Sequence, residues 1–432
     1  MKICHLVPGS GGTFYCQNCL RDYSLVRALR KSGADAVMIP LYLPPFGDEA
    51  ATAAGERVFF GGISVYLRHH LPWLRRAPEW VERALDANWL LKLAAKREGS
   101  TNAAKLGPMT ISMLEGRRGC HKKEFERLVD WIVNHEKPDL IHISNALLLG
   151  IASEIALAWG APIVCSLQDE EPWVEAMGMP YSSLCWKAMG GHARHVSKFI
   201  ATSSWYADRM AGRLHVPLKS IEVVHPGVEI DDDDDCGPLC LDPPTLGYLS
   251  RINAAQGFSH LVDALIELKQ DSSLKDARLR ASGGCTPADR AFLDAQLARL
   301  REHNFEDALE VVPRFTRPER CRFLKSLSVL SSPVPHGEAF GVQLIEAMAC
   351  GVPVVQPRAG AYPEIIAATG GGILYDPAKP GALAQALRSL LADPDRAREM
   401  GEAGRAAVRE KFAIEKSAET MMQLYERVLR HE

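Results

Sequence analysis

The sequence lacks long apolar runs, a surplus of positive charge and a regular cysteine framework. No run of about 18 consecutive apolar residues is present, so a membrane-spanning helix is not expected. Lys and Arg number 50 against 53 Asp and Glu, a formal charge of −3, which does not favour nucleic acid as a partner. The apolar stretch at 1–8 is interrupted by Gly9-Ser10-Gly11-Gly12 before the core of a secretion signal could form. These absences argue against a membrane-spanning protein and against a general polyanion binder.

The 11 cysteines are odd in number and scattered, and Cys165 and Cys350 lie in apolar runs. Without a recognisable secretion signal, this usage indicates reduced thiols and a cytoplasmic protein. Cys16-Gln17-Asn18-Cys19 has the spacing of a redox or metal-binding pair, but no second pair follows at zinc-finger spacing. Two ordinary thiols near the start of a helix are therefore the favoured interpretation. The glycine loop lacks a full GxGxxG fingerprint, which argues against a dehydrogenase.

At 432 residues the chain is too long for one ordinary core, and two domains are expected. In the first half, apolar runs that favour strands alternate with segments of helical pattern. Strands are predicted at 3–8, 36–41, 140–143, 162–167, 199–201 and 221–224, and helices at 20–31, 125–135 and 147–159. Such alternation is typical of a parallel sheet covered by helices on both faces.

Residues 231–244, DDDDDCGPLCLDPP, interrupt this pattern. Adjacent aspartates repel one another and prolines block regular structure, so the segment is predicted to be a solvated linker. An acidic metal site is the alternative, although contiguous aspartates cannot all converge on one ion. The alternation then resumes, with strands predicted at 245–249, 278–281, 309–312, 328–331, 353–356 and 372–375, and helices at 260–269, 288–301, 342–350, 382–391, 396–410 and 415–430.

The expected fold class is therefore α/β, with two doubly wound parallel-sheet domains at 1–230 and 245–410. We expect these domains to face a central cleft, because ligands of such sheets bind beyond the carboxyl ends of the strands.

Two glutamates, Glu338 and Glu346, lie near the end of one predicted strand and inside the helix that follows. If the helix begins near Phe340, the N–H groups of Phe340, Gly341 and Val342 have no intrahelical partners and can bind a phosphate or diphosphate. Gly341 has no side chain, so a phosphate can approach closely.

Eight residues of helix rise about 12 Å, so the two carboxylates can hold hydroxyl groups on either side of a bound diphosphate. This arrangement suits a nucleotide sugar, with one carboxylate on the hexose and the other on the ribose. A glycosidase pair fits less well, because such carboxyls lie about 5 to 9.5 Å apart and act on one bond.

The stretch GEAFGVQLIEAMACGVPVV, followed by PEII, resembles the glutamate-x7-glutamate signature of the retaining family-4 glycosyltransferases, which have the GT-B fold. The resemblance extends over nearly the whole chain. The opening glycine loop, first helix and second strand of the family are similar to PGSGGTFYCQNCLRDYSLVRALRKSGADAVMI. The strand and phosphate loop of its second domain are similar to LGYLSRINAAQGFSHLVDAL. GGGILYDP matches as well, and the resemblance implies that the last helix, residues 411–432, returns to the N-terminal domain.

The resemblance implies a role for each matching position. Glu338 would bind the donor sugar and Glu346 the ribose, while the loop with Gly11 and Gly12 and the amides at 340–342 would hold the diphosphate. Arg251 would neutralise charge on the departing diphosphate. Backbone groups at 312–315 would meet the nucleobase. The implied reaction retains the anomeric configuration and needs no cofactor and no obligatory metal.

The phosphate loop departs from the family pattern, because Gln256 stands where relatives carry a Lys. A glutamine donates a hydrogen bond but brings no positive charge. The lost charge-assisted contact is worth on the order of 1.5 to 3 kcal/mol. Arg314 and Arg280 are candidate replacement cations.

The first domain departs as well. Gln168-Asp169-Glu170 follows a strand after which many relatives have a His, and Ser144 replaces a second His near the matching His142. Gln168 can hydrogen-bond a sugar hydroxyl but cannot act as an acid or base. Asp169 and Glu170 are therefore the carboxylates to consider for acceptor activation. The candidate catalytic residues are Glu338, Arg251, His142 and Asp169, and the candidate acceptor or sugar contacts are Gln168, Glu170 and His336.

These departures leave two interpretations open: an active transferase with an altered pocket, or a degenerate relative that binds nucleotide or glycan without turnover. The donor can be a UDP-, GDP- or ADP-sugar, and the acceptor a glycan, a lipid-linked sugar or a small molecule. Residues 66–98, with Trp73, Trp80 and Trp89, are either a peripheral membrane contact, an acceptor platform or a helical insertion packed on the first sheet.

Overall fold

The computed structural model describes residues 1–9, 15–42, 103–230 and 237–431. Contacts divide the chain into two compact units. Unit 1 comprises Met1–Gly12, Asn18–His225 and Ser417–Glu432, and unit 2 comprises Thr13–Gln17 and Pro226–Lys416. Gly11, Gly12, the tryptophan-rich segment 66–98 and the five adjacent aspartates of the predicted linker lie outside the described residues.

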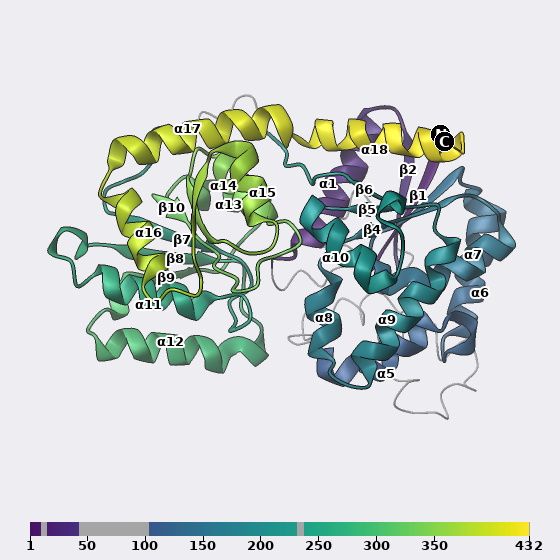
Figure 1. Cartoon of the computed structure of the whole chain (residues 1–432), viewed down its shortest axis with the longest axis horizontal. Helices are drawn as coiled ribbons and strands as arrows, with labels where there is room; N and C mark the ends of the chain where they lie inside the picture. The colour runs from purple at the N-terminus through teal and green to yellow at the C-terminus, as the bar shows by residue number, and fades with distance from the viewer. Residues whose placement is uncertain (10–14, 43–102, 231–236, 432) are drawn as a thin grey trace. The chain divides into compact units, whose positions relative to one another are not determined.

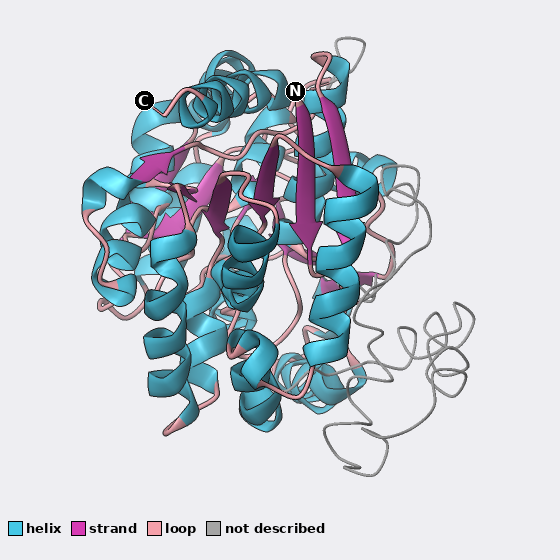
Figure 2. Cartoon of the chain, turned by 90° about the vertical axis from the view of Figure 1, so that its right-hand side faces the viewer, coloured by secondary structure: helices cyan, strands magenta, loops and turns pink. Residues whose placement is uncertain are grey.

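Unit 1 is built on a six-stranded sheet of order β2-β1-β3-β4-β5-β6, in which neighbouring strands run parallel. Helices lie on both faces of this sheet (Figure 2). The strands are β1 Lys2–Val7, β2 Asp35–Pro40, β3 Leu140–Ile143, β4 Ile163–Leu167, β5 Lys198–Ala201 and β6 Ile221–Val223. The α-helices are α1 Gln17–Lys31, α5 Ala103–Leu114, α6 Lys122–Trp131, α7 Ala152–Ala158, α8 Glu170–Ala176, α9 Tyr181–His192, α10 Ser204–Leu214 and α18 Ile414–Leu429.

Unit 2 repeats the plan with a second parallel six-stranded sheet, of order β12-β11-β10-β7-β8-β9 (Figure 1). Its strands are β7 Thr245–Leu249, β8 Arg278–Ser282, β9 Leu309–Val312, β10 Val329–Leu330, β11 Val354–Pro357 and β12 Gly372–Tyr375. Its helices are α11 Phe258–Leu268, α12 Arg290–Glu302, α13 Arg317–Leu324, α14 Val342–Ala349, α15 Tyr362–Thr369, α16 Ala382–Leu391 and α17 Pro394–Lys411.

The cores explain why short apolar runs form central strands. All five residues of β4 and of β7 are buried, as expected for strands covered on both faces. In unit 2, the Tyr248 ring packs edge-on against Phe258 at 4.9 Å between ring centroids. Burying a large apolar side chain of this kind stabilises the fold by about 1.5–3 kcal/mol.

The strand order reverses once in each sheet, between β1 and β3 in unit 1 and between β7 and β10 in unit 2. Ligands of doubly wound sheets bind outside the carboxyl ends of the strands at such a point. The topology therefore directs attention to the loops that follow these four strands.

The α/β fold class and all six strands of each sheet are confirmed, but helix boundaries differ from the prediction. The helix predicted at 147–159 begins as a 3-10 turn, Ala146–Ile151, and only α7 is α-helical. Helix α14 begins at Val342, the start of the helix predicted at 342–350, and not near Phe340, because Gly341 has φ 114°, outside the helical region. Helices α5, α8, α9, α10, α13 and α15 were not predicted.

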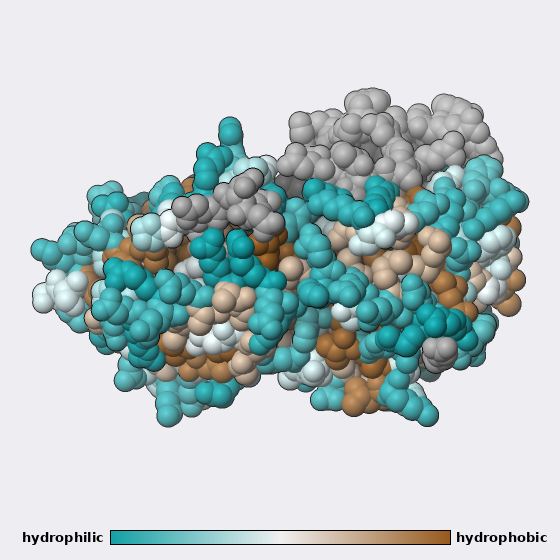
Figure 3. Space-filling model, turned by 90° about the horizontal axis from the view of Figure 1, so that it is seen from above, coloured by the Kyte–Doolittle hydropathy of each residue, from teal (hydrophilic) through white to brown (hydrophobic). Residues whose placement is uncertain are grey.

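In the part of the chain that the structure describes, few large apolar side chains reach solvent. Among the described residues, the exposed large hydrophobics are Met1, Leu157, Met179, Leu184 and Leu218. In the face seen in Figure 3, hydrophilic residues separate the hydrophobic patches. No helix in the described ranges has both the length and the apolar character to cross a membrane.

Candidate functional site

The loops after β7 and β10 pack tightly against each other at the reversal point of unit 2. Gly257 closes the first loop with φ 75°, and a Cβ there would lie 2.1 Å from the carbonyl oxygen of Pro333 in the second loop. No other residue type fits this contact without moving backbone. The loop with Arg251 and the loop with Glu338 are therefore held side by side.

Glu338 is buried, 7% exposed, and both of its carboxylate oxygens accept hydrogen bonds. Oε2 accepts from Gln343 Nε2 at 2.6 Å and from Tyr362 Oη at 2.9 Å, and Oε1 accepts from Gln17 Nε2 at 3.1 Å. Burial raises the pKa of Glu338, and these three neutral donors offset the increase only in part. The carboxylate is thus held in place by neutral groups.

The first amide of α14 is also engaged. Val342 N donates to Gln17 Oε1 at 3.0 Å, so the Gln17 amide contacts both the helix N-terminus and the Glu338 carboxylate. Gln17 thus presents an oxygen to the Val342 N–H and an N–H donor to the Glu338 carboxylate. A sugar phosphate would offer the same two groups, a phosphate oxygen and a hydroxyl donor, at these atoms. The described contacts of Gln17 therefore resemble those predicted for a donor.

Glu346 lies on α14 and faces a buried arginine. Arg320 donates to Glu346 Oε1 from Nε at 3.1 Å and from Nη2 at 2.9 Å, and Tyr15 Oη donates to Oε2 at 2.7 Å. Although burial acts to lower it, the charge of Glu346 holds the pKa of Arg320 above its usual value. Glu346 is therefore paired with a cation. The contacts that the structure describes for Glu338 are all with neutral groups.

Arg251, in the loop after β7, pairs with a carboxylate from the loop after β8. Its Nε and Nη2 donate to the two oxygens of Asp289 at 2.7 and 3.1 Å. Partial burial acts to raise the pKa of Asp289, but hydrogen bonds from Arg251 and Thr286 lower it overall. Gln256 lies in the same loop as Arg251, and its Oε1 accepts from Ser250 Oγ at 3.1 Å.

The other cations named from sequence do not join this group. The side chain of Arg314 is 81% exposed and lies 3.6 Å from Glu319. Arg280 lies within β8, where it pairs with Glu310 of β9 at 2.7 Å. His336 is exposed in the loop between β10 and α14. Phe340 is buried, with its ring centroid 5.9 Å from that of Phe412.

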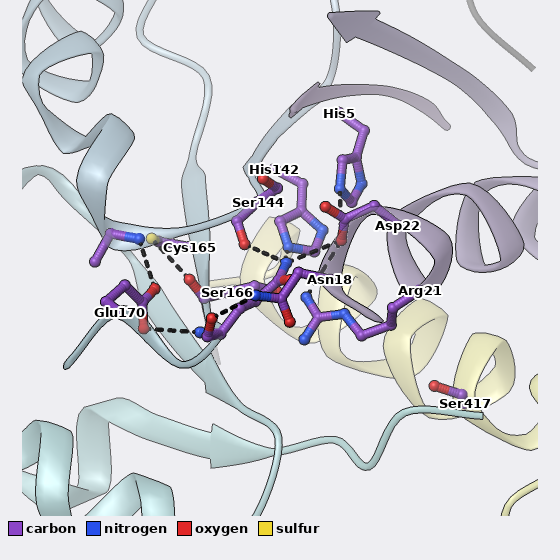
Figure 4. Close-up of polar contacts among 12 residues, drawn as sticks. His5, Asn18, Arg21, Asp22, His142, Ser144, Cys165, Ser166, Glu170 and Ser417 are labelled. Atoms are coloured by element: carbon purple, nitrogen blue, oxygen red, sulfur yellow. Dashed lines mark hydrogen bonds and ion pairs between the residues drawn. The ribbon is translucent and has the colours of Figure 1, made fainter. Parts of the chain in front are cut away.

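In unit 1, a buried polar cluster lies at the carboxyl ends of β1, β3 and β4 (Figure 4). His142 is fully buried, and its ring nitrogens lie 2.6 Å from Tyr425 Oη and 2.8 Å from Ser166 Oγ. Burial, with His5 and Arg21 nearby, lowers the pKa of His142 well below its usual value. A neutral imidazole with both nitrogens engaged is suited to positioning.

Gln168 and Glu170 belong to the same cluster. Gln168 Nε2 donates to Asp22 Oδ1 at 2.9 Å and to the Ser144 carbonyl. Glu170 accepts from Ala146 N at 2.9 Å, from Gln168 N at 2.8 Å and from Tyr206 Oη at 2.6 Å. Both side chains therefore hold the fold together at this edge.

Asp169, between them, is only partly buried and adopts φ 63°, in the left-handed region. Aspartate tolerates this conformation better than most residues, and such positions often cluster at functional sites. Of the three neighbours, Asp169 is the one that is not fully buried.

Sequence reasoning missed several residues that complete the unit 2 site. Arg320 and Gln343 carry no local signal that marks them as partners of the two glutamates. Tyr15 and Gln17 lie in the opening stretch that the family resemblance covers, but the glutamates that they contact are more than 320 positions away.

Two regions match known families of proteins. Residues 233–407 match the family described as glycosyl transferases group 1, and residues 107–232 match the family described as Glycosyltransferase Family 4.

Among similar sequences, an alpha-maltose-1-phosphate synthase of Mycolicibacterium smegmatis is 30% identical over 326 residues, which is 69% of this chain and 82% of that protein. A D-inositol 3-phosphate glycosyltransferase of Xylanimonas cellulosilytica is 28% identical over 240 residues, 52% of this chain and 56% of that protein.

Among solved structures, a sucrose-phosphate synthase from Thermosynechococcus elongatus has a TM-score of 0.72 and 19% identity, covering 100% of both chains. Anabaena HepE in complex with UDP and glucose has a TM-score of 0.68 and 16% identity, covering 99% of both chains. Together with the two parallel sheets, these likenesses assign the GT-B fold.

Proposed function

Because this chain belongs to the family-4 glycosyltransferases, we propose that it moves a hexose from a nucleotide-sugar donor to an acceptor with retention of anomeric configuration. The observation that carries the proposal is the placement of two carboxylates on either side of the α14 N-terminus. Glu338 precedes the helix and Glu346 lies within it, with the Val342 amide between them in sequence.

We assign the donor sugar to Glu338, the diphosphate to Val342 N and Arg251, and the ribose to Glu346. The two carboxylates have different surroundings, which suits two different hydroxyl-bearing groups. For a donor to bind in this way, it must replace Gln17 at Val342 N and at Glu338. Its phosphate oxygen and sugar hydroxyl would take over the same two hydrogen bonds.

In the proposed reaction, the bond between the anomeric carbon and the diphosphate oxygen breaks, and the acceptor oxygen bonds to the same face of that carbon. The acceptor proton passes to an oxygen of the departing diphosphate. Arg251 would stabilise the charge on the leaving group without an obligatory metal ion. Activity that is unchanged by EDTA is expected, and loss that Mg²⁺ restores would contradict this part.

The acceptor is assigned to unit 1, with the partly buried Asp169 as the carboxylate to consider there. The compared proteins include an alpha-maltose-1-phosphate synthase, a D-inositol 3-phosphate glycosyltransferase and a sucrose-phosphate synthase, and each name contains a phosphorylated small molecule. Phosphorylated small molecules are therefore the first acceptors to test, followed by glycans and lipid-linked sugars.

The test begins with thermal shifts in UDP, GDP, ADP and their glucose conjugates, because a ligand that binds only the folded state stabilises it by mass action. The stabilising donor is then incubated with each acceptor class, and nucleoside diphosphate release is measured. Product formation whose anomeric configuration matches the donor supports the proposal, whereas inversion of configuration would refute it.

A second candidate function is binding without turnover. It is favoured by Gln256 in place of a Lys and by Arg251, whose guanidinium is already paired with Asp289. Ligand-induced stabilisation with no release of nucleoside diphosphate for any acceptor class would support this alternative.

A further inference from the structure

Arg320 is the most buried cation at the unit 2 site, and nothing in the glutamate motif predicts it. It lies on α13, is 7% exposed, and directs two N–H groups at one oxygen of Glu346. Removing one partner of a buried ion pair is costly, because it leaves the other charge uncompensated. The pair therefore defines where the Glu346 carboxylate can lie.

The same guanidinium reaches a second part of the site. Arg320 Nη1 donates to the carbonyl oxygen of Phe315 at 2.9 Å, in the loop that follows β9. That loop is the segment assigned to the nucleobase by resemblance. A guanidinium is planar and rigid, so contacts at different nitrogens fix the relative positions of the groups that they touch.

Tyr15 completes the arrangement around Glu346. Its ring centroid lies 5.5 Å from the Arg320 guanidinium carbon, and its hydroxyl donates to Glu346 Oε2. Tyr15 N in turn donates to Gly283 O at 2.8 Å. A carboxylate has about four lone-pair sites, and these three hydrogen bonds leave about one of them for an incoming hydroxyl.

We propose that Arg320 is a positioning residue that couples recognition of the donor ribose to recognition of the nucleobase. It orients the remaining acceptor site of Glu346 toward a ribose hydroxyl and holds the Phe315 carbonyl in the base segment. The inference rests on the proposed function, since it takes a nucleoside diphosphate as the ligand of this site.

The test compares wild type, R320K and R320M by calorimetric titration with UDP, GDP and ADP. The nucleotide that binds best is titrated again as its 2′-deoxy and 3′-deoxy forms. For wild type, loss of the hydroxyl that Glu346 binds should weaken affinity about tenfold to a hundredfold, as for a hydrogen bond to a charged group.

In R320K, the single ammonium group of lysine replaces the planar guanidinium and its several N–H donors. The loss of affinity on removing that hydroxyl should therefore fall to about threefold or less. Preference among UDP, GDP and ADP should narrow in the same variant. R320M should show the same losses with a larger fall in affinity, and R320K keeps the test available if R320M does not fold.

R317K is the matched control, because Arg317 lies on the same helix but pairs with Glu229, at 3.3 Å, instead of Glu346. It should keep both the ribose penalty and the base preference of wild type. The inference would be overturned, with the proposed function left in place, if R320K kept the ribose penalty and the base preference of wild type. It would also be overturned if R317K lost them to the same extent as R320K. A wild type that binds none of the three nucleotides would overturn both.

Discussion

The polar groups at the two sheet edges differ in burial and in the partners that hold them. In unit 1, the ion pair of Arg21 with Asp22 and the carboxylate of Glu170 lie almost fully inside the protein, together with the buried neutral imidazole of His142. In unit 2, the side chains of Arg251 and Glu346 keep 22% and 15% of their surface exposed. A buried network stabilises the fold that contains it, whereas partly exposed charges can exchange their partners for a ligand.

The largest expected effect is the loss of activity in E338Q, which is compared with E170Q in the other unit. E338Q should lower the rate of sugar transfer at least about a hundredfold, because hydrogen bonds from a sugar to a charged acceptor are worth about 1.5–3 kcal/mol each. Its thermal unfolding should stay close to wild type, because the lost charge is unfavourably buried. Nucleoside diphosphate release and calorimetry measure the two outcomes.

E170Q is the matched control in unit 1. Each oxygen of the Glu170 carboxylate accepts from a backbone N–H, which cannot turn around to accept from an amide NH₂, whereas the three donors to Glu338 are all side chains. E170Q should therefore lose about 1–3 kcal/mol of unfolding free energy while its affinity for the donor stays unchanged. A stable E170Q protein together with an unfolded E338Q protein would reverse the comparison.

The next effect concerns Gln256, in the loop that is proposed to hold the phosphates. Q256K should tighten binding of the nucleoside diphosphate about tenfold, because it adds a charge-assisted contact beside Arg251. D289N, which releases Arg251 from its ion pair, should act in the same direction. Titration calorimetry at two salt concentrations checks both variants, and weaker binding by Q256K would place the phosphates elsewhere.

A smaller effect is expected on the pH dependence of donor binding. The pKa of Glu338 is raised by burial, so as pH falls its carboxylate takes up a proton earlier than an exposed glutamate, and donor affinity should decline at a correspondingly higher pH. Y362F removes a hydroxyl that favours the charged form and should move this decline to still higher pH.

The effect on stability has the opposite sign. Between the unfolded and folded pKa values the folded state binds more protons at Glu338, so the cost of burying this charge is relieved as pH falls. Donor affinity measured at a series of pH values tests the prediction. The prediction would be contradicted if donor affinity declined at the pH where an ordinary glutamate takes up a proton. It would also be contradicted if the decline came at the same pH in Y362F as in wild type.

The smallest effect is expected from the terminal helix in unit 1. Y425F removes the hydroxyl that contacts His142 and should lower the free energy of unfolding by about 1 kcal/mol. Donor affinity should not change. Urea unfolding measures the first quantity, and a Y425F protein with weakened donor binding would show that the unit 1 cluster does more than support the fold.

Much of the architecture could be predicted because its signals are local. Apolar runs buried on both faces mark the strands of each sheet, and alternation with helices implies parallel order. The interval between Glu338 and Glu346 likewise follows from the turn and helix that contain them. Helices such as α9 escaped because their apolar and polar residues lack a clear helical period, and their form depends on packing.

Sequence alone therefore determined two α/β domains and a pair of carboxylates beside a helix N-terminus, since each depends on neighbours within a few turns of chain. Only the tertiary structure decided that Arg320 meets Glu346, that Tyr15 and Gln17 reach the same two glutamates, and that His142 lies against Tyr425. Side chains so far apart in the sequence meet through the winding of whole sheets. No local period records which partners they find.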